Sequence, residues 1–148
     1  MISPEILRKY PHFTGANEKL LGKVAMISNI SSYNAGEEIL QEGKAAKFFY
    51  FITSGEVNVV YRLGDNRVVV TDNLIAGDAF GWSSMLEPHR FTATCISEID
   101  CECIEVSAAD LNKLFDEDTA FGYRFMKEVA RMMRDRINGL RVQIAASL

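Results

Sequence analysis

The sequence predicts a mainly β protein with helices at both ends, and two features of the chain support this. Between residues 27 and 106, runs rich in β-branched and aromatic residues alternate with glycine-containing turns. Short strands at this spacing are typical of sandwiches, barrels and jelly rolls. Residues 1–26 and 107–148 instead have the apolar spacing of helices. The 148 residues suffice for one domain with its own core.

The N-terminal 26 residues predict short helices. Ser3 is expected to cap a first helix with Pro4 at its first position, and Pro11 ends that helix. A second helix fits residues 17–26, because four apolar residues there fall on one helical face: Leu20, Leu21, Val24 and Ala25.

Six runs of strand-like sequence follow the N-terminal helices. Glycines in the intervening turns permit the positive φ angles that tight turns require. Gly64-Asp65-Asn66 is a strong hairpin signal between two β-branched runs. The runs occupy residues 27–33, 38–40, 48–53, 56–63, 68–75 and 91–106.

The chain returns to helix after the last of these runs. Ser107 is the expected N-cap, with Asp110 three residues later as in a capping box. A long helix is expected over residues 120–146, where apolar residues recur every three or four positions. Such a stripe either pairs with a second helix as a dimer interface or packs on the β-region of its own chain. We predict the dimer interface, formed by Met126, Val129, Met133, Ile137, Leu140 and Ile144.

Charge is divided unevenly along the chain, whose formal net charge is -4. Residues 121–148 hold six basic side chains against Glu128 and Asp135, which leaves a net charge of +4 there and -8 on the rest. The long helix is therefore either a basic surface for an acidic partner or nucleic acid, or the solvated flank of a pairing helix. The basic residues interleave with the apolar stripe, which favours the second interpretation. The acidic remainder argues against a domain that binds nucleic acid with its whole surface.

The cysteines and the lack of a visible export signal predict a cytoplasmic protein. Cys95, Cys101 and Cys103 are odd in number and lie in strand-like sequence, which indicates reduced thiols. The C-x-C pair is interpreted as two small residues on one strand face, because no second pair completes a zinc site. No apolar stretch approaches the roughly 20 residues that span a bilayer, so we expect no membrane contact.

Histidine is too scarce for the metal enzymes that share jelly-roll architectures. Their sites use clustered histidines with an acidic ligand, and this chain has only His12 and His89. No Ser-His-Asp signature, glycine-rich nucleotide loop or zinc-binding histidine pair is visible. We therefore expect a protein that is not an enzyme and has no metal site.

Three motifs in the β-region carry a family resemblance. The first is GEEILQEG at residues 36–43 with FFYFITSGEV at 48–57; the others are IAGDAFG at 75–81 and TAT at 92–94. Together they resemble the cyclic-nucleotide-binding domain family, which includes the catabolite activator protein and the regulatory subunits of protein kinase A. The resemblance implies an eight-stranded β-roll, a jelly-roll fold, over residues 27–106. It also implies a phosphate-binding cassette at 80–94, N-terminal helices at 1–26 and C-terminal helices at 107–148.

The same resemblance places a ligand site in the cassette, at Gly81, Trp82, Ser83, Ser84, Arg90, Phe91 and Thr92. Nucleotide-binding members carry a glutamate at the Trp82 position that holds the ribose 2′-hydroxyl, whereas an indole can only donate a hydrogen bond. Trp82 therefore either plugs the cavity or stacks on a base.

The other half of this site predicts anion binding. Ser83 and Ser84 begin a short helix whose N-terminus favours an anion. The family's arginine corresponds to Phe91, with Arg90 one residue away, and a shift of one residue reverses the side a strand residue faces. Arg90 therefore either binds an anion with its guanidinium or pairs with a carboxylate on the surface.

These features predict a regulatory domain that senses a small molecule. The expected ligand is anionic, either a cyclic nucleotide (cAMP or cGMP) or another phosphate or carboxylate, and the signal would pass through the C-terminal dimer helix. The alternative is a degenerate module that binds no ligand and serves as a dimerising scaffold. In the catabolite activator group a helix-turn-helix follows the long helix; this sequence stops at Leu148, so we expect no DNA-binding domain in the chain.

Overall fold

The computed structural model describes residues 2–148, and Met1 lies outside the described residues. Short 3₁₀ helices and one α-helix come first: η1 (Pro4–Lys9), η2 (Pro11–Phe13) and α1 (Glu18–Met26). The strands are β1 (Ser28–Tyr33), β2 (Glu38–Leu40), β3 (Phe48–Ser54), β4 (Glu56–Arg62), β5 (Val68–Ile75), β6 (Ala79–Phe80), β7 (Thr94–Ser97) and β8 (Cys101–Ser107). The remaining helices are η3 (Trp82–Met85), α2 (Ala108–Glu117) and α3 (Thr119–Ala146).

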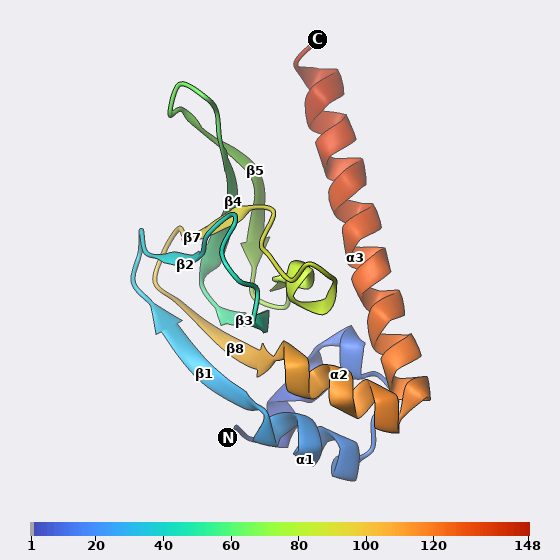
Figure 1. The fold of residues 1–148 in the computed structure, drawn as a ribbon. Coiled ribbons are helices and arrows are strands. Elements are labelled where there is room, and N and C mark those ends of the chain that lie inside the picture. The colour runs from blue at the N-terminus through green and yellow to red at the C-terminus, as the bar shows by residue number, and fades with distance from the viewer. Residues whose placement is uncertain (1) are drawn as a thin grey trace.

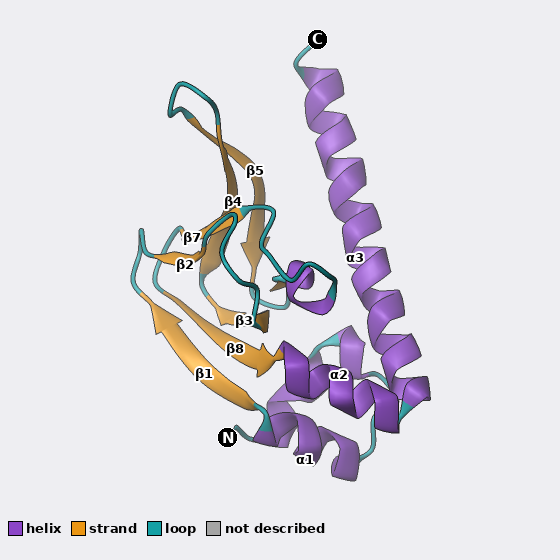
Figure 2. Cartoon of the chain, viewed as in Figure 1, coloured by secondary structure: helices purple, strands orange, loops and turns teal. Residues whose placement is uncertain are grey.

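Within residues 2–148, eight strands form two antiparallel sheets in the orders β1-β8-β3-β6 and β2-β7-β4-β5. This arrangement confirms the predicted eight-stranded roll with flanking helices, which Figures 1 and 2 show from one side. Two details of the strand prediction were wrong. The run 91–106 is interrupted by a turn into β7 and β8, and the two-residue β6 was not predicted because it is too short to show a pattern.

Strand β3 separates two apolar cores. Phe49 and Phe51 face the cluster formed by the N-terminal segment, α2 and α3, whereas Tyr50 and Ile52 face the interior of the roll. A strand buried on both faces has a nearly continuous apolar sequence, which is what residues 48–52 show. This strand therefore contributes side chains to both cores, one on each of its faces.

The N-terminal segment covers one end of this sheet. Asn17 caps α1, since its Oδ1 accepts a hydrogen bond from the Leu20 amide at 2.9 Å. The prediction for Ser3 was wrong: its side chain makes no capping bond, and the first helix is a 3₁₀ helix. The Tyr10 hydroxyl donates to the Ile52 carbonyl at 2.7 Å and ties the segment to β3. Pro11 ends η1 as predicted and begins η2, which carries His12.

The hairpin predicted at Gly64-Asp65-Asn66 and the N-cap predicted at Ser107 are both present. Asn66 adopts a φ of 68° in the turn between β4 and β5. Ser107 accepts from the Asp110 amide at 3.3 Å, and Asp118 accepts from the Phe121 amide at 3.1 Å to begin α3. In Figure 1, α3 passes beside the roll and the short helix η3 and continues to the C-terminus. No helix in residues 2–148 combines the length and apolarity that crossing a membrane requires.

The three cysteines lie inside the roll as free thiols. Cys101 and Cys103 share one buried face of β8, as predicted from their spacing. Burial raises the pKa of the Cys95 thiol to about 12. A buried thiol that stays protonated is a poor nucleophile and a poor metal ligand, so these residues serve packing.

Candidate functional site

The cassette begins with a sharp turn at Gly81. This residue has a φ of +85°, and a Cβ placed on it would lie 3.0 Å from both the Phe48 carbonyl oxygen and the Tyr50 ring. Only glycine fits such a turn without strain or displacement of its neighbours. The turn directs the chain from β6 into η3, which contains Trp82, Ser83 and Ser84.

The two serines of η3 turn inward. Both are buried, and the Ser84 hydroxyl donates to the Gly81 carbonyl at 2.6 Å. The Ser84 amide donates to the same carbonyl at 3.0 Å. Both donors of Ser84 are therefore used inside the turn, and an anion that recruited them would have to break these bonds.

Arg90 and Phe91 point to opposite sides of the chain. Arg90 is exposed, pairs as an isolated bridge with Ala45, and donates from Nη1 to the Gly43 carbonyl at 2.9 Å. Phe91 is buried in the roll interior. The arginine thus faces the β2–β3 loop, and Phe91, which the sequence resemblance aligned with the family's arginine, lies in the roll interior.

A small cavity of about 40 Å³ lies against the cassette. Sites for small molecules usually measure about 300 Å³ or more, so this space holds no nucleotide in the conformation described. Trp82 lines it and also packs, half-buried, against the core under the helices. Five of the seven predicted site residues line this cavity: Gly81, Trp82, Ser83, Phe91 and Thr92. The other two, Ser84 and Arg90, do not.

Arg136 of α3 also lines this cavity and was not predicted as a site residue. Its guanidinium donates to the Ala79 carbonyl, and Nε lies 3.6 Å from the Asp72 carboxylate of β5. Burial lowers the pKa of Arg136, and Asp72 partly offsets that effect. The sequence held one signal for it. Arg136 follows Val129 by seven residues, two helical turns later, and therefore shares the face that packs on the protein.

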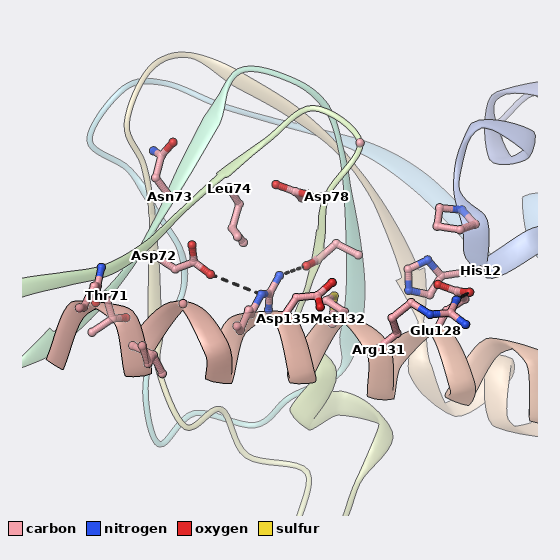
Figure 3. Close-up of a pocket in the computed structure, with 17 residues that line it drawn as sticks. His12, Thr71, Asp72, Asn73, Leu74, Asp78, Glu128, Arg131, Met132 and Asp135 are labelled. Atoms are coloured by element: carbon pink, nitrogen blue, oxygen red, sulfur yellow. Dashed lines mark hydrogen bonds and ion pairs between the residues drawn. The ribbon is translucent and has the colours of Figure 1, made fainter. Parts of the chain in front are cut away.

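A larger cavity of about 480 Å³ lies on the other side of Arg136, between α3 and the segment from β5 to β6. Figure 3 shows the side chains that line this cavity. Its two dashed lines mark the contacts of Arg136 with the Asp72 carboxylate and the Ala79 carbonyl. Four carboxylates and two guanidiniums line it: Asp72, Asp78, Glu128, Asp135, Arg131 and Arg136. The cavity is therefore acidic on balance, although the helix that forms one wall is basic overall.

His12 closes one end of this larger cavity. It is 5% exposed, and neither ring nitrogen has a hydrogen-bond partner among residues 2–148. Its ring lies 5.0 Å from that of Phe125 and 5.1 Å from that of Phe51, measured between centroids. Burial lowers the pKa of His12 to about 4, with Glu128 acting in the opposite direction. The imidazole is therefore neutral at pH 7.

The predicted dimer residues divide into two groups along α3. Val129 is buried in the core of its own chain, with Met126 and Met133 packed against that core. Ile137, Leu140 and Ile144 are 48%, 40% and 61% exposed. Packing within the same chain thus accounts for Met126, Val129 and Met133. The prediction of a dimer therefore depends on the exposed residues Ile137, Leu140 and Ile144.

Comparison with known proteins agrees with this geometry. The family profile described as "Cyclic nucleotide-binding domain" matches residues 30–118. The cGMP-dependent protein kinase isozyme 1 of Drosophila melanogaster is 28% identical over 118 residues, which are 78% of this chain and 15% of the kinase. The chain therefore spans only a small part of that relative.

Two solved structures show the same fold. A candidate cyclic nucleotide-binding protein from Geobacter metallireducens is 27% identical with a TM-score of 0.81, covering 93% of this chain and 99% of that one. The regulatory domain of Toxoplasma gondii PKA, solved with cAMP, is 27% identical with a TM-score of 0.66, covering 74% and 42%. The family profile covers more than half of the sequence, and the chain belongs to the cyclic nucleotide-binding domain family.

Proposed function

We propose that this chain is a regulatory domain that senses a small anion, and that Arg136 is the residue that connects the ligand to the output helix. The observation that carries the proposal is the position of Arg136, which is part of α3 yet lines the cassette cavity. Its side chain is only 19% exposed and has an acidic partner in Asp72. A phosphate or carboxylate at the cassette would compete for the same guanidinium.

The proposed signal is a change in the position of α3. Arg136 holds the helix against the roll through the Ala79 carbonyl and Asp72. A ligand of nucleotide size requires the 40 Å³ cavity to open, and Arg136 is the lining residue that α3 contributes. Ligand binding shifts such an equilibrium only by its different affinity for the two states. Cyclic AMP, cyclic GMP and other small phosphates or carboxylates are the candidate ligands.

A second candidate function is a dimerising scaffold that binds no ligand. The small volume of the cassette cavity favours it, together with Trp82 in the position where nucleotide-binding relatives carry a glutamate. A site that lacks a buried polar contact discriminates strongly against the ligand that needs it. This candidate predicts that no nucleotide or carboxylate changes the stability of the protein.

Calorimetric titration with cAMP, cGMP, other nucleotides and small carboxylates separates the two functions. We expect a phosphate-bearing ligand to bind, and Arg136→Ala to weaken it at least tenfold, because the variant removes the charge that faces the cavity. Arg90→Ala is the matched control and should bind like wild type, since Arg90 faces the β2–β3 loop. If Arg90→Ala lost binding and Arg136→Ala did not, the result would assign the anion site to Arg90. If none of these compounds binds, the result would support the function as a dimerising scaffold.

Dimerisation through the outer half of α3 is a separate prediction. Three exposed aliphatic residues on one helical face favour pairing, because burial of apolar surface stabilises association. We expect a dimer by sedimentation at roughly tens of micromolar, and Ile144→Asp should shift it towards monomer. Ile99→Asp places the same charge on an exposed residue between β7 and β8 and should leave the dimer intact. A wild-type monomer at that concentration would contradict the prediction.

The proposal includes three further features of the protein. Residues 1–148 act as one regulatory domain; the domain binds a ligand but catalyses no reaction; and it works in the cytoplasm, where its buried thiols stay reduced.

A further inference from the structure

The 480 Å³ cavity between α3 and the β5–β6 segment has a different chemistry from the cassette. Hydrogen-bond acceptors dominate its lining. The carboxylates of Asp72, Asp78, Glu128 and Asp135 are among these acceptors. Its volume falls within the range of small-molecule sites. An acceptor-rich, acidic cavity of this size selects a ligand that carries N–H donors and positive charge.

His12 is the observation that distinguishes this cavity from an ordinary acidic surface. A buried imidazole normally forms at least one hydrogen bond, and that of His12 forms none among residues 2–148. Packing alone does not require a histidine here, because phenylalanine would fill the same aromatic cluster without a polar group. The neutral ring provides one nitrogen that can accept a hydrogen bond, at the end of the cavity where Glu128 also lies (Figure 3).

Arg131 occupies the place beside His12 that a ligand would take. Its guanidinium donates to Glu128, and the side chain is 45% exposed. Figure 3 shows His12, Glu128 and Arg131 together at this end of the cavity. An ion pair with one exposed partner stabilises a protein only weakly, so Arg131 can turn into solvent. That movement leaves the carboxylate and the covered imidazole to an incoming cation.

Two of the other carboxylates, Asp135 and Asp78, can also accept hydrogen bonds from a ligand. Asp135 pairs with Arg134 at 3.1 Å, and both side chains are 65% exposed. Asp78 accepts a hydrogen bond from the Ile75 amide at 2.9 Å and has a second oxygen available. Glu128 and Asp135 are seven residues apart on one helical face, which separates them by about 10 Å along the axis. Two positive groups joined by an aliphatic chain can reach both.

We propose that this cavity binds a linear aliphatic polyamine, with one ammonium group between His12 and Glu128 and another near Asp135 and Asp78. The site is separate from the cassette and does not depend on the function proposed for it. Because η2, β5 and α3 all contribute residues, an occupied cavity would fasten the N-terminal segment and the roll to the output helix. Three-ligand metal coordination is a poor alternative, since no cluster of three His, Cys, Asp or Glu suited to a metal occurs in residues 2–148.

Calorimetric titration of the full chain with spermidine at low ionic strength and pH 7 tests the site. We expect binding that His12→Phe weakens at least tenfold, because phenylalanine keeps the aromatic packing and removes the acceptor. Arg131→Ala should strengthen binding several-fold, since it removes the cation that competes for Glu128. A merely structural role for these two residues would not produce opposite changes.

Two matched variants control for charge and for folding. Glu42→Gln removes an exposed carboxylate outside the cavity, and Arg141→Ala removes a basic residue of α3 that does not line it. Both should bind spermidine like wild type. The proposal is overturned if spermidine gives no binding, if His12→Phe binds as tightly as wild type, or if Glu42→Gln loses as much affinity. Circular dichroism verifies that each variant is folded, and Arg131→Ala retains its diagnostic value if His12→Phe is not.

Discussion

Acidification from pH 7 to pH 4 is expected to destabilise the protein by about 3 kcal/mol through His12 alone. The folded state keeps this imidazole neutral because burial lowers its pKa from 6.5 to about 4. Between these two values the unfolded chain binds more protons than the folded one. The free energy of unfolding therefore falls as the pH falls, and this contribution is complete below pH 4.

Urea unfolding of wild type and His12→Phe at pH 7 and pH 4.5 measures this effect. Carboxylates titrate in the same range and contribute equally to both proteins, so the difference between them isolates His12. An equal acid loss in His12→Phe and wild type would contradict the assignment.

Replacement of Gly55 by alanine is expected to cost about 4 kcal/mol or more, or to prevent folding. Gly55 has a φ of +90°, and a Cβ there would lie 2.4 Å from the Asp100 carbonyl oxygen and from the Cys101 Cβ. Neither atom can turn away as the end of a flexible side chain could, because one belongs to the backbone and the other is a Cβ attached directly to it at the start of β8. The chain at Gly55 and the chain at Asp100 and Cys101 would have to move apart to accept the methyl group.

Gly36→Ala separates the steric effect from the backbone effect. Gly36 has a φ of +88°, and nothing lies within 4 Å of its added Cβ. Its substitution should cost only the left-handed conformation of a non-glycine residue, about 1–2 kcal/mol. Urea unfolding of both variants measures the difference. Equal losses in the two proteins would show that the close approach at Gly55 is relaxed easily.

The two cavities give α3 a central position in the molecule. Arg136 lines both of them, and its partners are the Ala79 carbonyl of β6 and Asp72 of β5. Under the proposals made above, an anion at the cassette would compete for Arg136, whereas a polyamine in the acidic cavity would fasten the helix to the roll. The two ligands would then oppose each other, since each favours a different position of the same helix.

Local pattern was sufficient for most elements of the fold. The helix predicted over 17–26 spans Glu18–Met26, with Asn17 as its cap. The hairpin at Gly64-Asp65-Asn66 and the N-cap at Ser107 formed as expected. These features depend on residues close in sequence, because caps and tight turns are satisfied by backbone groups two to four residues away.

Prediction of the candidate site was less complete, and the reason is geometric. The cassette motif located Gly81, Trp82, Ser83, Phe91 and Thr92 around one cavity. Arg136 lies more than forty residues later, and only the path of α3 across the roll brings it to the same place. Arg90 was attractive because of its charge, but the direction of a side chain in an irregular strand depends on register.

The sequence by itself determined the class of fold, the order of its elements and the family, because hydrophobic periodicity, turn glycines and caps are local properties. Only the tertiary structure decided which charges face a cavity and which face solvent. In the tertiary structure His12 is buried among aromatic rings and Arg136 lines the cassette cavity. The apolar stripe of α3 is partly in the core and partly on the surface. These outcomes depend on how distant segments pack, since burial and electrostatic environment are set by neighbours in space.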